Sequence, residues 1–233
     1  MIKSILTQEH VDIWLVLLDT VDGDQSILSA DELSRAQRFV QRDAQNRFIK
    51  THVALRQILS KYLVLPPKMI MFDQTDKGKP LIKTTSALQF NVSHSGDYAL
   101  IGVSAQNPVG VDIEKVREKP DLLAIAKRFF SICEYQAIKK LPIDRQTAAF
   151  YRCWTRKEAF IKAIGAGLSF PLSDFEVDIT ENPGARTLLL DVKQKSQSSA
   201  DWDLQAVTGL PVGYEGALCV RSQTKQIQRL KCL

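Results

Sequence analysis

Residues 108–115 read Pro-Val-Gly-Val-Asp-Ile-Glu-Lys, an apolar run that ends in two carboxylates with one apolar residue between them. Side chains two apart on a β-strand share a face, so Asp112 and Glu114 point the same way while the residue between them points into the core. Adjacent carboxylates repel one another, and their hard oxygens suit Mg²⁺ better than softer metals. The plainer alternative is a strand that ends at the surface, with Lys115 and Arg117 as ion-pair partners.

A second stretch, residues 154–165, reads Trp-Thr-Arg-Lys-Glu-Ala-Phe-Ile-Lys-Ala-Ile-Gly and predicts a helix. Its Glu158 and Lys162 lie four residues apart and therefore on one side of that helix. By itself such a pair is most often a solvated ion pair worth only about 0.3–0.5 kcal/mol. Its place in a larger pattern therefore has to carry any functional interpretation.

Periodicity places the other elements outward from these two stretches. Helices are expected at Ser29–Leu63, Leu122–Phe130, Ser131–Lys140 and Arg145–Ile164, and strands at Asp12–Leu18, Met69–Phe72, Leu88–Ser93, Tyr98–Ser104, Val109–Glu114, Phe175–Ile179, Thr187–Val192, Trp202–Ala206 and Ala217–Arg221. Asp76–Pro80 has the composition of an exposed turn.

The order of these elements predicts an α+β protein in which helix followed by strands occurs twice. Capping boxes, Ser29-x-x-Glu32 and Ser131-x-x-Glu134, open a helix in each cycle, although two such boxes can arise by chance in unrelated helices. The boundary is expected near Asn107-Pro108, which divides the chain into residues 1–107 and residues 108–233.

The composition is that of a globular chain, with 233 residues, 45% hydrophobic and 24% charged. It has no apolar run of the roughly 20 residues that span a bilayer, and Met1–His10 lacks the layout of a secretory signal, so a cytoplasmic protein with no membrane partner is expected. The four cysteines show no C-x-x-C spacing and the three histidines lie far apart, which indicates neither a disulfide framework nor a zinc site.

The charge balance favours anionic partners. A formal net charge of +5 and a pI near 9.0 fit nucleic acid, a phosphorylated cofactor or an acidic protein. The chain lacks an RNP-type aromatic pair, a GXXG loop and a zinc knuckle, which argues against a nucleic-acid partner. It also lacks a Walker-type loop, and Phe170 occupies the place of the third glycine of a dinucleotide fingerprint.

The two stretches together resemble the 4′-phosphopantetheinyl transferase superfamily of the surfactin-synthetase-activating (Sfp-like) type. In that family a G-[IV]-D-[IV]-E strand precedes a W-x-x-K-E-[AS]-x-x-K helix, and both occur here in order. The resemblance extends over most of the chain, through the blocks Gly78–Pro80, Phe90–Gly96, Ala126–Ser131 and Gly165-x-Gly167-Leu168.

The resemblance implies a monomeric pseudo-dimer of two similar α/β subdomains, each with a long helix packed on an antiparallel sheet. It implies an enzyme, a holo-[acyl-carrier-protein] synthase that moves the 4′-phosphopantetheine moiety of coenzyme A onto a serine of an apo acyl or peptidyl carrier protein. Adenosine 3′,5′-bisphosphate would leave. Residues 1–107 would contact the coenzyme A nucleotide, and residues 108–233 would supply the metal ligands, the catalytic helix and the carrier-protein docking surface.

Carried over by position, the family's Mg²⁺ ligands are Asp112, Glu114 and Glu158, and Lys162 contacts the phosphate under attack. Asp112, Glu158 and Lys162 would be catalytic, since such a transfer depends on a metal and a fixed cation that offset charge while the acceptor oxygen is aligned. The resemblance offers Glu158 as general base, either directly or through water held by the metal.

The resemblance also implies which residues bind coenzyme A: Arg35 and Arg38 at the 3′-phosphate, Lys77, Gly78, Lys79 and Pro80 on the adenine side, Asn91, Ser93 and His94 near the nucleotide, and Lys157 with Lys162. A plain surface turn and a strand-end histidine are the alternatives for the second and third groups. Glu32 departs from some relatives, which carry a lysine near that place.

The carrier protein would dock at Gly165 to Lys195, helped by basic side chains because carrier helices are typically acidic. The sequence does not disclose which carriers are served or whether acylated coenzyme A is accepted. Two rival functions remain: a basic nucleic-acid-binding module, and a Mg²⁺-dependent phosphohydrolase with water as the acceptor.

Overall fold

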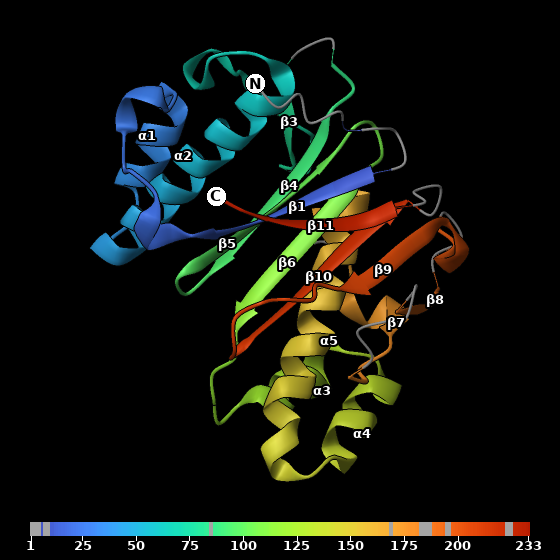
Figure 1. Cartoon of the computed structure of the whole chain (residues 1–233). Helices are drawn as coiled ribbons and strands as arrows, with labels where there is room; N and C mark the ends of the chain where they lie inside the picture. The colour runs from blue at the N-terminus through green and yellow to red at the C-terminus, as the bar shows by residue number, and fades with distance from the viewer. Residues whose placement is uncertain are drawn as a thin grey trace.

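Two β-sheets stack face to face, and a long helix covers the outer face of each (Figure 1). A computed structural model describes residue 6 and residues 10–83, 86–167, 170–181, 188–193, 197–221 and 226–233, with the backbone alone at 226–231. The first sheet has the strand order β11-β1-β5-β4 and the second the order β6-β10-β9. The bounds are β1 His10–Leu17, β4 Gln89–Ser95, β5 Tyr98–Ser104, β6 Val109–Lys115, β9 Trp202–Ala206, β10 Tyr214–Arg221 and β11 Gln226–Cys232.

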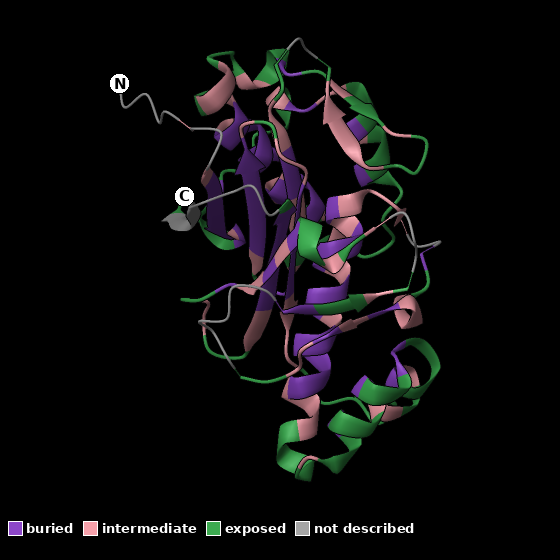
Figure 2. Ribbon diagram, turned by 90° about the vertical axis from the view of Figure 1, so that its right-hand side faces the viewer, coloured by how far each residue is buried: buried purple, intermediate pink, exposed green. Residues whose placement is uncertain are grey.

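Strand alternation divides the apolar side chains among three cores. Val11, Ile13 and Leu15 of β1 meet Val111 and Ile113 of β6 in the core between the two sheets. Side chains on the opposite faces pack under α2 (Arg42–Leu63) in the first half and α5 (Ile143–Ile164) in the second. The central strands β1, β5, β6 and β10 are therefore mostly buried, as the purple ribbons of Figure 2 show.

The two halves repeat one topology. In each, a first strand leads to a 22-residue helix and then to a pair of strands, and the third strand lies between the first and the second. β1, α2, β4 and β5 thus correspond to β6, α5, β9 and β10. The α+β pseudo-dimer expected from the sequence is confirmed. One strand departs from the division at 107/108, because β11 pairs in parallel with β1 in the sheet of the first half.

Shorter elements extend each half. They are α1 Ala30–Gln37, β2 Phe72–Gln74 and β3 Pro80–Ile82 in the first, and α3 Leu122–Phe129, α4 Ile132–Lys140, β7 Phe175–Val177 and β8 Leu189–Val192 in the second. Both capping boxes form as predicted. The 3-10 turns are Leu18–Thr20, Gln25–Ile27, Pro67–Met69, Leu172–Asp174 and Ser199–Asp201.

Some element predictions were wrong. The expected helix Ser29–Leu63 is two helices, α1 and α2, with residues 38–41 between them. Of the expected strand Met69–Phe72, Met69 ends a 3-10 turn and only Phe72 belongs to a strand. Neither β3 nor β11 was predicted. Thr187 of the expected strand Thr187–Val192 lies outside the described residues.

The long helices end in the same left-handed conformation with different residues. Gly165 ends α5 with φ 67°, whereas Val64 ends α2 with φ 56°. A left-handed conformation costs an L-residue about 1–2 kcal/mol, and Val64 is 80% exposed, so it gains little from burial in return.

We expect Val64→Gly to raise the free energy of unfolding by about 0.5–1 kcal/mol, because the relieved strain exceeds the added entropy of the unfolded chain. Urea unfolding measures this. The matched control is Val40→Gly, at a fully exposed valine between α1 and α2, which has no positive φ and should lose stability. Equal losses in both variants would contradict the prediction.

Across the helices that the structure describes, none is long and apolar enough to cross a membrane.

Candidate active site

The carboxylates of β6 face helix α5. Val111 and Ile113 point into the core between the sheets, so Gly110, Asp112 and Glu114 point to the other side, where α5 lies. A Cβ on Gly110 would lie 2.1 Å from Ala159 O and 2.3 Å from Ala163 N. The strand and the helix therefore contact each other backbone to backbone at this glycine, and that contact brings the Glu158 to Lys162 turn of α5 next to Asp112.

Asp112 and Lys162 form the centre of the site. Lys162 Nζ lies 2.6 Å from Asp112 Oδ1 and donates to Ser93 Oγ at 3.1 Å, while Ser93 Oγ donates to Asp112 Oδ1 at 2.7 Å. Asp112 is 3% exposed, and its second oxygen, Oδ2, is buried with no hydrogen-bond partner. A buried carboxylate oxygen without a donor is costly, and a further cation or donor at this point would satisfy it.

Two glutamates complete the acidic cluster. Glu114, on β6, accepts a hydrogen bond from Ser95 Oγ at 2.6 Å through its Oε2. Burial and then the negative charges of Asp112 and Glu114 raise the pKa of Glu158, against the opposing effect of Lys162. Burial likewise raises the pKa of Glu114, and the Asp112 charge adds to it. The three carboxylates are thus close enough to repel one another.

The predicted metal shell is not preformed. Among the residues that the structure describes, no group of three His, Cys, Asp or Glu side chains is arranged to hold a metal ion. The ammonium of Lys162 instead neutralises Asp112. The donor set nevertheless fits a hard divalent cation, because all three side chains are carboxylates and Asp112 Oδ2 has no partner.

A cleft of about 400 Å³ opens beside this cluster. It is lined from both halves, by Arg47 of α2, His94 at the end of β4, Glu114 of β6, and Phe150 and Trp154 of α5. Glu114 is the carboxylate of the acidic cluster that lines this cleft. Asp112 lies on the same face of β6, and Glu158 and Lys162 lie on the face of α5 that meets it. One side of the cleft carries basic side chains and the other aromatic ones. On the aromatic side the rings of Phe150 and Trp154 stack with their centres 6.0 Å apart. Trp154 is half-buried and also packs against the core of the second half.

Two family sequence models cover the chain almost end to end. The model described as "4'-phosphopantetheinyl transferase superfamily" matches residues 108–218, and the one described as "4'-phosphopantetheinyl transferase, N-terminal" matches residues 14–106. The chain belongs to the 4′-phosphopantetheinyl transferase superfamily. The resemblance suggested by the sequence motifs is confirmed, and the chain is an enzyme of this class.

Named relatives agree with this assignment. The chain is 33% identical to the 4'-phosphopantetheinyl transferase psf-1 of Bacillus pumilus over 231 residues, which cover 94% of this chain and 95% of the relative. It is 36% identical to HetI of Nostoc sp. over 78% of this chain and 79% of the relative. It is 38% identical to Sfp of Bacillus subtilis over 67% of this chain and 69% of the relative.

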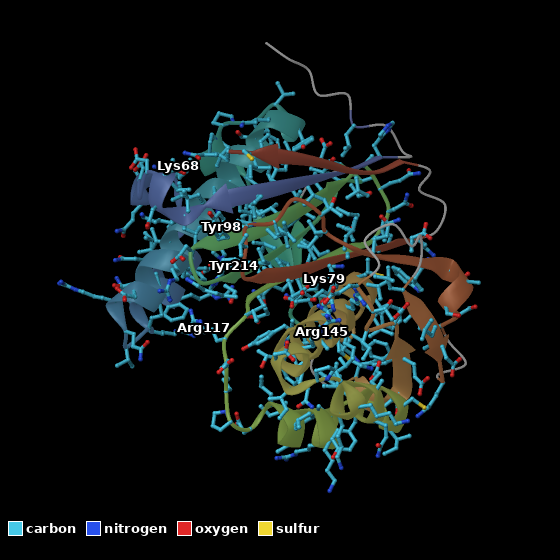
Figure 3. All side chains as sticks on the ribbon, turned by 60° about the horizontal axis from the view of Figure 1, so that its bottom comes forward. Lys68, Lys79, Tyr98, Arg117, Arg145 and Tyr214 are labelled. Atoms are coloured by element: carbon cyan, nitrogen blue, oxygen red, sulfur yellow. The ribbon has the colours of Figure 1, made fainter. Side chains whose placement is uncertain are left out.

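In this transferase, Lys79 binds the turn that was predicted to contact adenine to β6 and α5. Its Nζ donates to Val109 O at 3.1 Å and to Ala163 O at 3.0 Å, and burial lowers the pKa of the amine to about 8. The acceptor on α5 lies in the last turn of the helix, where carbonyls attract a cation. In Figure 3 Lys79 lies against α5, so its ammonium binds the protein itself, whereas Lys77 and Gly78 are exposed and Pro80 begins β3.

The other expected coenzyme A contacts divide into exposed and structural side chains. Arg35 and Arg38 are exposed, with the Arg35 guanidinium 5.5 Å from the ring centre of Phe48. Asn91 is buried, and its side-chain oxygen accepts from Val111 N at 2.9 Å. His94 is exposed at the cleft; partial desolvation and then nearby positive charges lower its pKa.

Glu32 belongs to the framework of the first half. It is buried and closes the capping box, and it accepts hydrogen bonds from His52 and Arg56. Burial raises the pKa of Glu32, but these two donors outweigh it and lower the pKa to about 2. Glu32 is therefore a fixed anion inside the protein.

The structure contradicts the prediction made for Lys157. It was expected to bind coenzyme A, but its side chain is fully buried, pairs with Glu134 at 2.8 Å, and donates to Leu172 O and Phe175 O. Neighbouring helical residues point about 100° apart, so Lys157 faces the core while Glu158 faces β6. It holds α4, α5 and the start of β7 together.

We expect Lys157→Met to lower the free energy of unfolding by about 3–5 kcal/mol, because it leaves the Glu134 carboxylate buried and unpaired. Urea unfolding measures the loss. Lys127→Met, at an exposed lysine of α3, is the control and should change stability by less than about 0.5 kcal/mol. A stable Lys157→Met variant with weakened coenzyme A binding would contradict the structural role.

Sequence reasoning missed several cleft residues, among them Ser95, Arg47 and Phe150. The alternation of side chains along β4 could have indicated one of them, Ser95. Because side chains two apart share a face, Ser95 of β4 points the same way as Asn91 and Ser93, toward β6.

Proposed function

We propose that this transferase moves the 4′-phosphopantetheine group of coenzyme A to a serine of an apo acyl or peptidyl carrier protein with the help of Mg²⁺. One observation carries the proposal: Asp112 and Glu114 of β6 lie with Glu158 and Lys162 of α5 beside a cleft that both halves line. The names of the relatives state phosphopantetheinyl transfer, which requires a donor of that group and an acceptor.

In the proposed reaction the acceptor serine oxygen attacks the phosphorus that carries the pantetheine arm. A bond from that phosphorus to the bridging oxygen of the diphosphate breaks, and adenosine 3′,5′-bisphosphate leaves with the electron pair. Glu158 accepts the serine proton, either directly or through a water that the metal would hold. Lys162 turns from Asp112 to the diphosphate and offsets its charge.

The same carboxylates would hold the metal. Bound by Asp112, Glu114 and Glu158, Mg²⁺ would offset diphosphate charge and help to orient the diphosphate. Asp112 offers its unpartnered Oδ2 for this purpose, and Glu114 is held by Ser95 with its carboxylate at the cleft. The chain thereby supplies a set of fixed oxygens whose mutual repulsion a cation relieves.

The proposal for the nucleotide rests on the resemblance and on exposed basic side chains, among them Arg35, Arg38 and Lys77. Arg35 and Arg38 would bind the 3′-phosphate, Lys77 and Gly78 the adenine side, and Ser93 and His94 the phosphates. Lys79, Pro80 and Asn91 would shape that pocket from behind, since the Lys79 ammonium and the Asn91 side-chain oxygen bind the protein.

The proposed docking of the carrier protein rests on the positive charge of the cleft lining. The cleft has Arg47, Lys115, Arg117 and Lys119 among its lining residues, and these suit an acidic carrier helix. The stretch expected from the resemblance, Gly165 to Lys195, is described only in part, without residues 168–169, 182–187 and 194–195. Its described residues do not line the cleft.

Two further points belong to this proposal. Action as a monomer is supported by the cleft, since one chain supplies both of its sides. Action in the cytoplasm rests on the expectation drawn from the sequence.

The decisive test incubates the chain with coenzyme A, Mg²⁺ and an apo carrier protein, followed by intact-mass analysis of the carrier. The carrier should gain one phosphopantetheine group, EDTA should stop the gain, and added Mg²⁺ should restore it, because the carboxylates need a cation beside the diphosphate. Release of free phosphopantetheine without a carrier would favour a hydrolase, and salt-dependent RNA retention without coenzyme A binding would favour a nucleic-acid-binding module.

A further inference from the structure

Strands β4 and β6 lie in different sheets, and polar side chains of β4 join them. Asn91 Oδ1 accepts from Val111 N, Ser93 Oγ donates to Asp112 Oδ1, and Ser95 Oγ donates to Glu114 Oε2. The bonded positions advance together along both strands. Alternate side chains of β4 therefore hold β6, and two of these bonds end on the carboxylates of the site.

The Ser95 hydroxyl makes two hydrogen bonds, one as donor and one as acceptor. Its Oγ donates to Glu114 Oε2 at 2.6 Å and accepts from Lys115 N at 3.1 Å. A hydroxyl has one hydrogen to donate, so its direction is set once the acceptor and the backbone donor are in place. Ser95 thus ties the Glu114 side chain and the following peptide of β6 to one point.

The turn after Ser95 is pressed against β6 and β10. Gly96 has φ 57°, and a Cβ on it would lie 2.4 Å from Tyr214 Oη and 2.7 Å from Lys115 Cδ. The Lys115 ammonium also pairs with Asp97 at 2.9 Å. In Figure 3, Tyr98 and Tyr214 lie side by side at this end of the strands, with ring centres 5.1 Å apart. The backbone that carries Ser95 is therefore fixed from outside the acidic cluster.

Glu114 has a competing direction in which to turn. Its cross-strand neighbour on β10 is Glu215, which binds Arg152 of α5 at 3.1 Å. Ser95 lies on the opposite side, on β4. A glutamate side chain that loses its hydrogen bond regains rotamer freedom, so without Ser95 the Glu114 carboxylate can turn from the cleft toward the β10 side.

We propose that Ser95 is a positioning residue of the transfer reaction: its hydroxyl fixes Glu114 Oε2 so that the carboxylate stays on the cleft side of β6 and can share a divalent cation with Asp112 and Glu158. The inference rests on the proposed function. It assigns to Ser95 the task of setting cation affinity, acting through Glu114 and without a contact to coenzyme A. Partners of this kind typically change metal affinity or activity by about 10–100-fold when they are removed.

The test compares Ser95→Ala, Ser95→Thr and Ser60→Ala. Ser60 is the matched control, since its hydroxyl makes a single hydrogen bond of 2.8 Å to Gln57 O within α2. The first measurement is the Mg²⁺ concentration that half-saturates the rise in melting temperature, with neither coenzyme A nor carrier present. The second is the half-saturating Mg²⁺ for transfer, together with KM for coenzyme A.

We expect Ser95→Ala to raise both Mg²⁺ midpoints about 10-fold with little change in KM for coenzyme A. Ser95→Thr, which keeps the hydroxyl, and Ser60→Ala should stay close to the wild-type midpoints. Unchanged midpoints in Ser95→Ala, or a fall in melting temperature alone, would overturn the proposal. So would a wild-type protein whose melting temperature does not respond to Mg²⁺.

A double-mutant cycle with Glu114→Ala shows whether Ser95 acts through the glutamate. Ser95→Ala should add almost nothing to the Mg²⁺ midpoint once Glu114 is alanine, because the two residues are then one unit. Additive effects would overturn the proposal. A wild-type chain that binds Mg²⁺ but transfers nothing to any carrier would refute the proposed function instead, while the melting experiments would still decide on Ser95.

Discussion

Glu158→Gln is expected to lower the transfer rate at saturating substrates by about 10²–10⁴-fold while the protein stays folded. The amide keeps the size of the side chain and loses both the proton-accepting oxygen and the charge. Because the carboxylate is half-buried among like charges, its removal relieves repulsion, and the melting temperature without Mg²⁺ should not fall. Intact-mass time courses of the carrier measure the rate.

The control for this variant is Glu118→Gln, at an exposed glutamate in the connection between β6 and α3, which should transfer at the wild-type rate. For the wild type without coenzyme A or carrier, the half-saturating Mg²⁺ concentration should rise toward acid pH, because protons compete with the cation for Glu158, whose pKa in the metal-free chain lies above the ordinary 4.5 of a glutamate. Near-wild-type transfer by Glu158→Gln would remove this residue from the proton-accepting role.

Gly110→Ala is expected to lower the free energy of unfolding by about 3 kcal/mol and the transfer rate by at least about 10²-fold. The added methyl would meet Ala159 O at 2.1 Å and Ala163 N at 2.3 Å, both backbone atoms of α5. No rotamer can relieve a clash with backbone, so the helix must shift and carry Glu158 and Lys162 away from Asp112. Urea unfolding and carrier mass analysis report the two losses.

Gly23→Ala is the matched control, since a Cβ there would have no atom within 4 Å. It should change stability by no more than about 0.5 kcal/mol. If Gly110→Ala also stayed within that limit, the close contact between β6 and α5 would not exist in solution.

Much of the site could be anticipated because it depends on simple periodicities. Side chains alternate along β6, which sets Asp112 and Glu114 on one face. In α5 a spacing of four residues, about one helical turn, aligns Glu158 with Lys162. The meeting of those faces depends on Gly110, whose role is visible only when the helix backbone lies against it. Which of the three carboxylates hold a metal stays a prediction.

Other features were beyond the sequence for physical reasons. A lysine carries the same charge in a core or in a cleft, so the pattern Lys157-Glu158 does not reveal that the first residue pairs with Glu134 inside the protein. Lys79 is a similar case, because its long side chain reaches inward from an exposed turn. β11 was missed because its partner β1 lies almost the whole chain away, and no local signal marks such a pairing.

That remote pairing has a consequence for synthesis on the ribosome. β1 is synthesised long before β11, and one of its two edges is covered only when β11 has left the exit tunnel. Until then a row of unpaired backbone N–H and C=O groups is open to strands of other chains. A chain stopped between β10 and β11 should therefore be more prone to aggregate than one that includes β11.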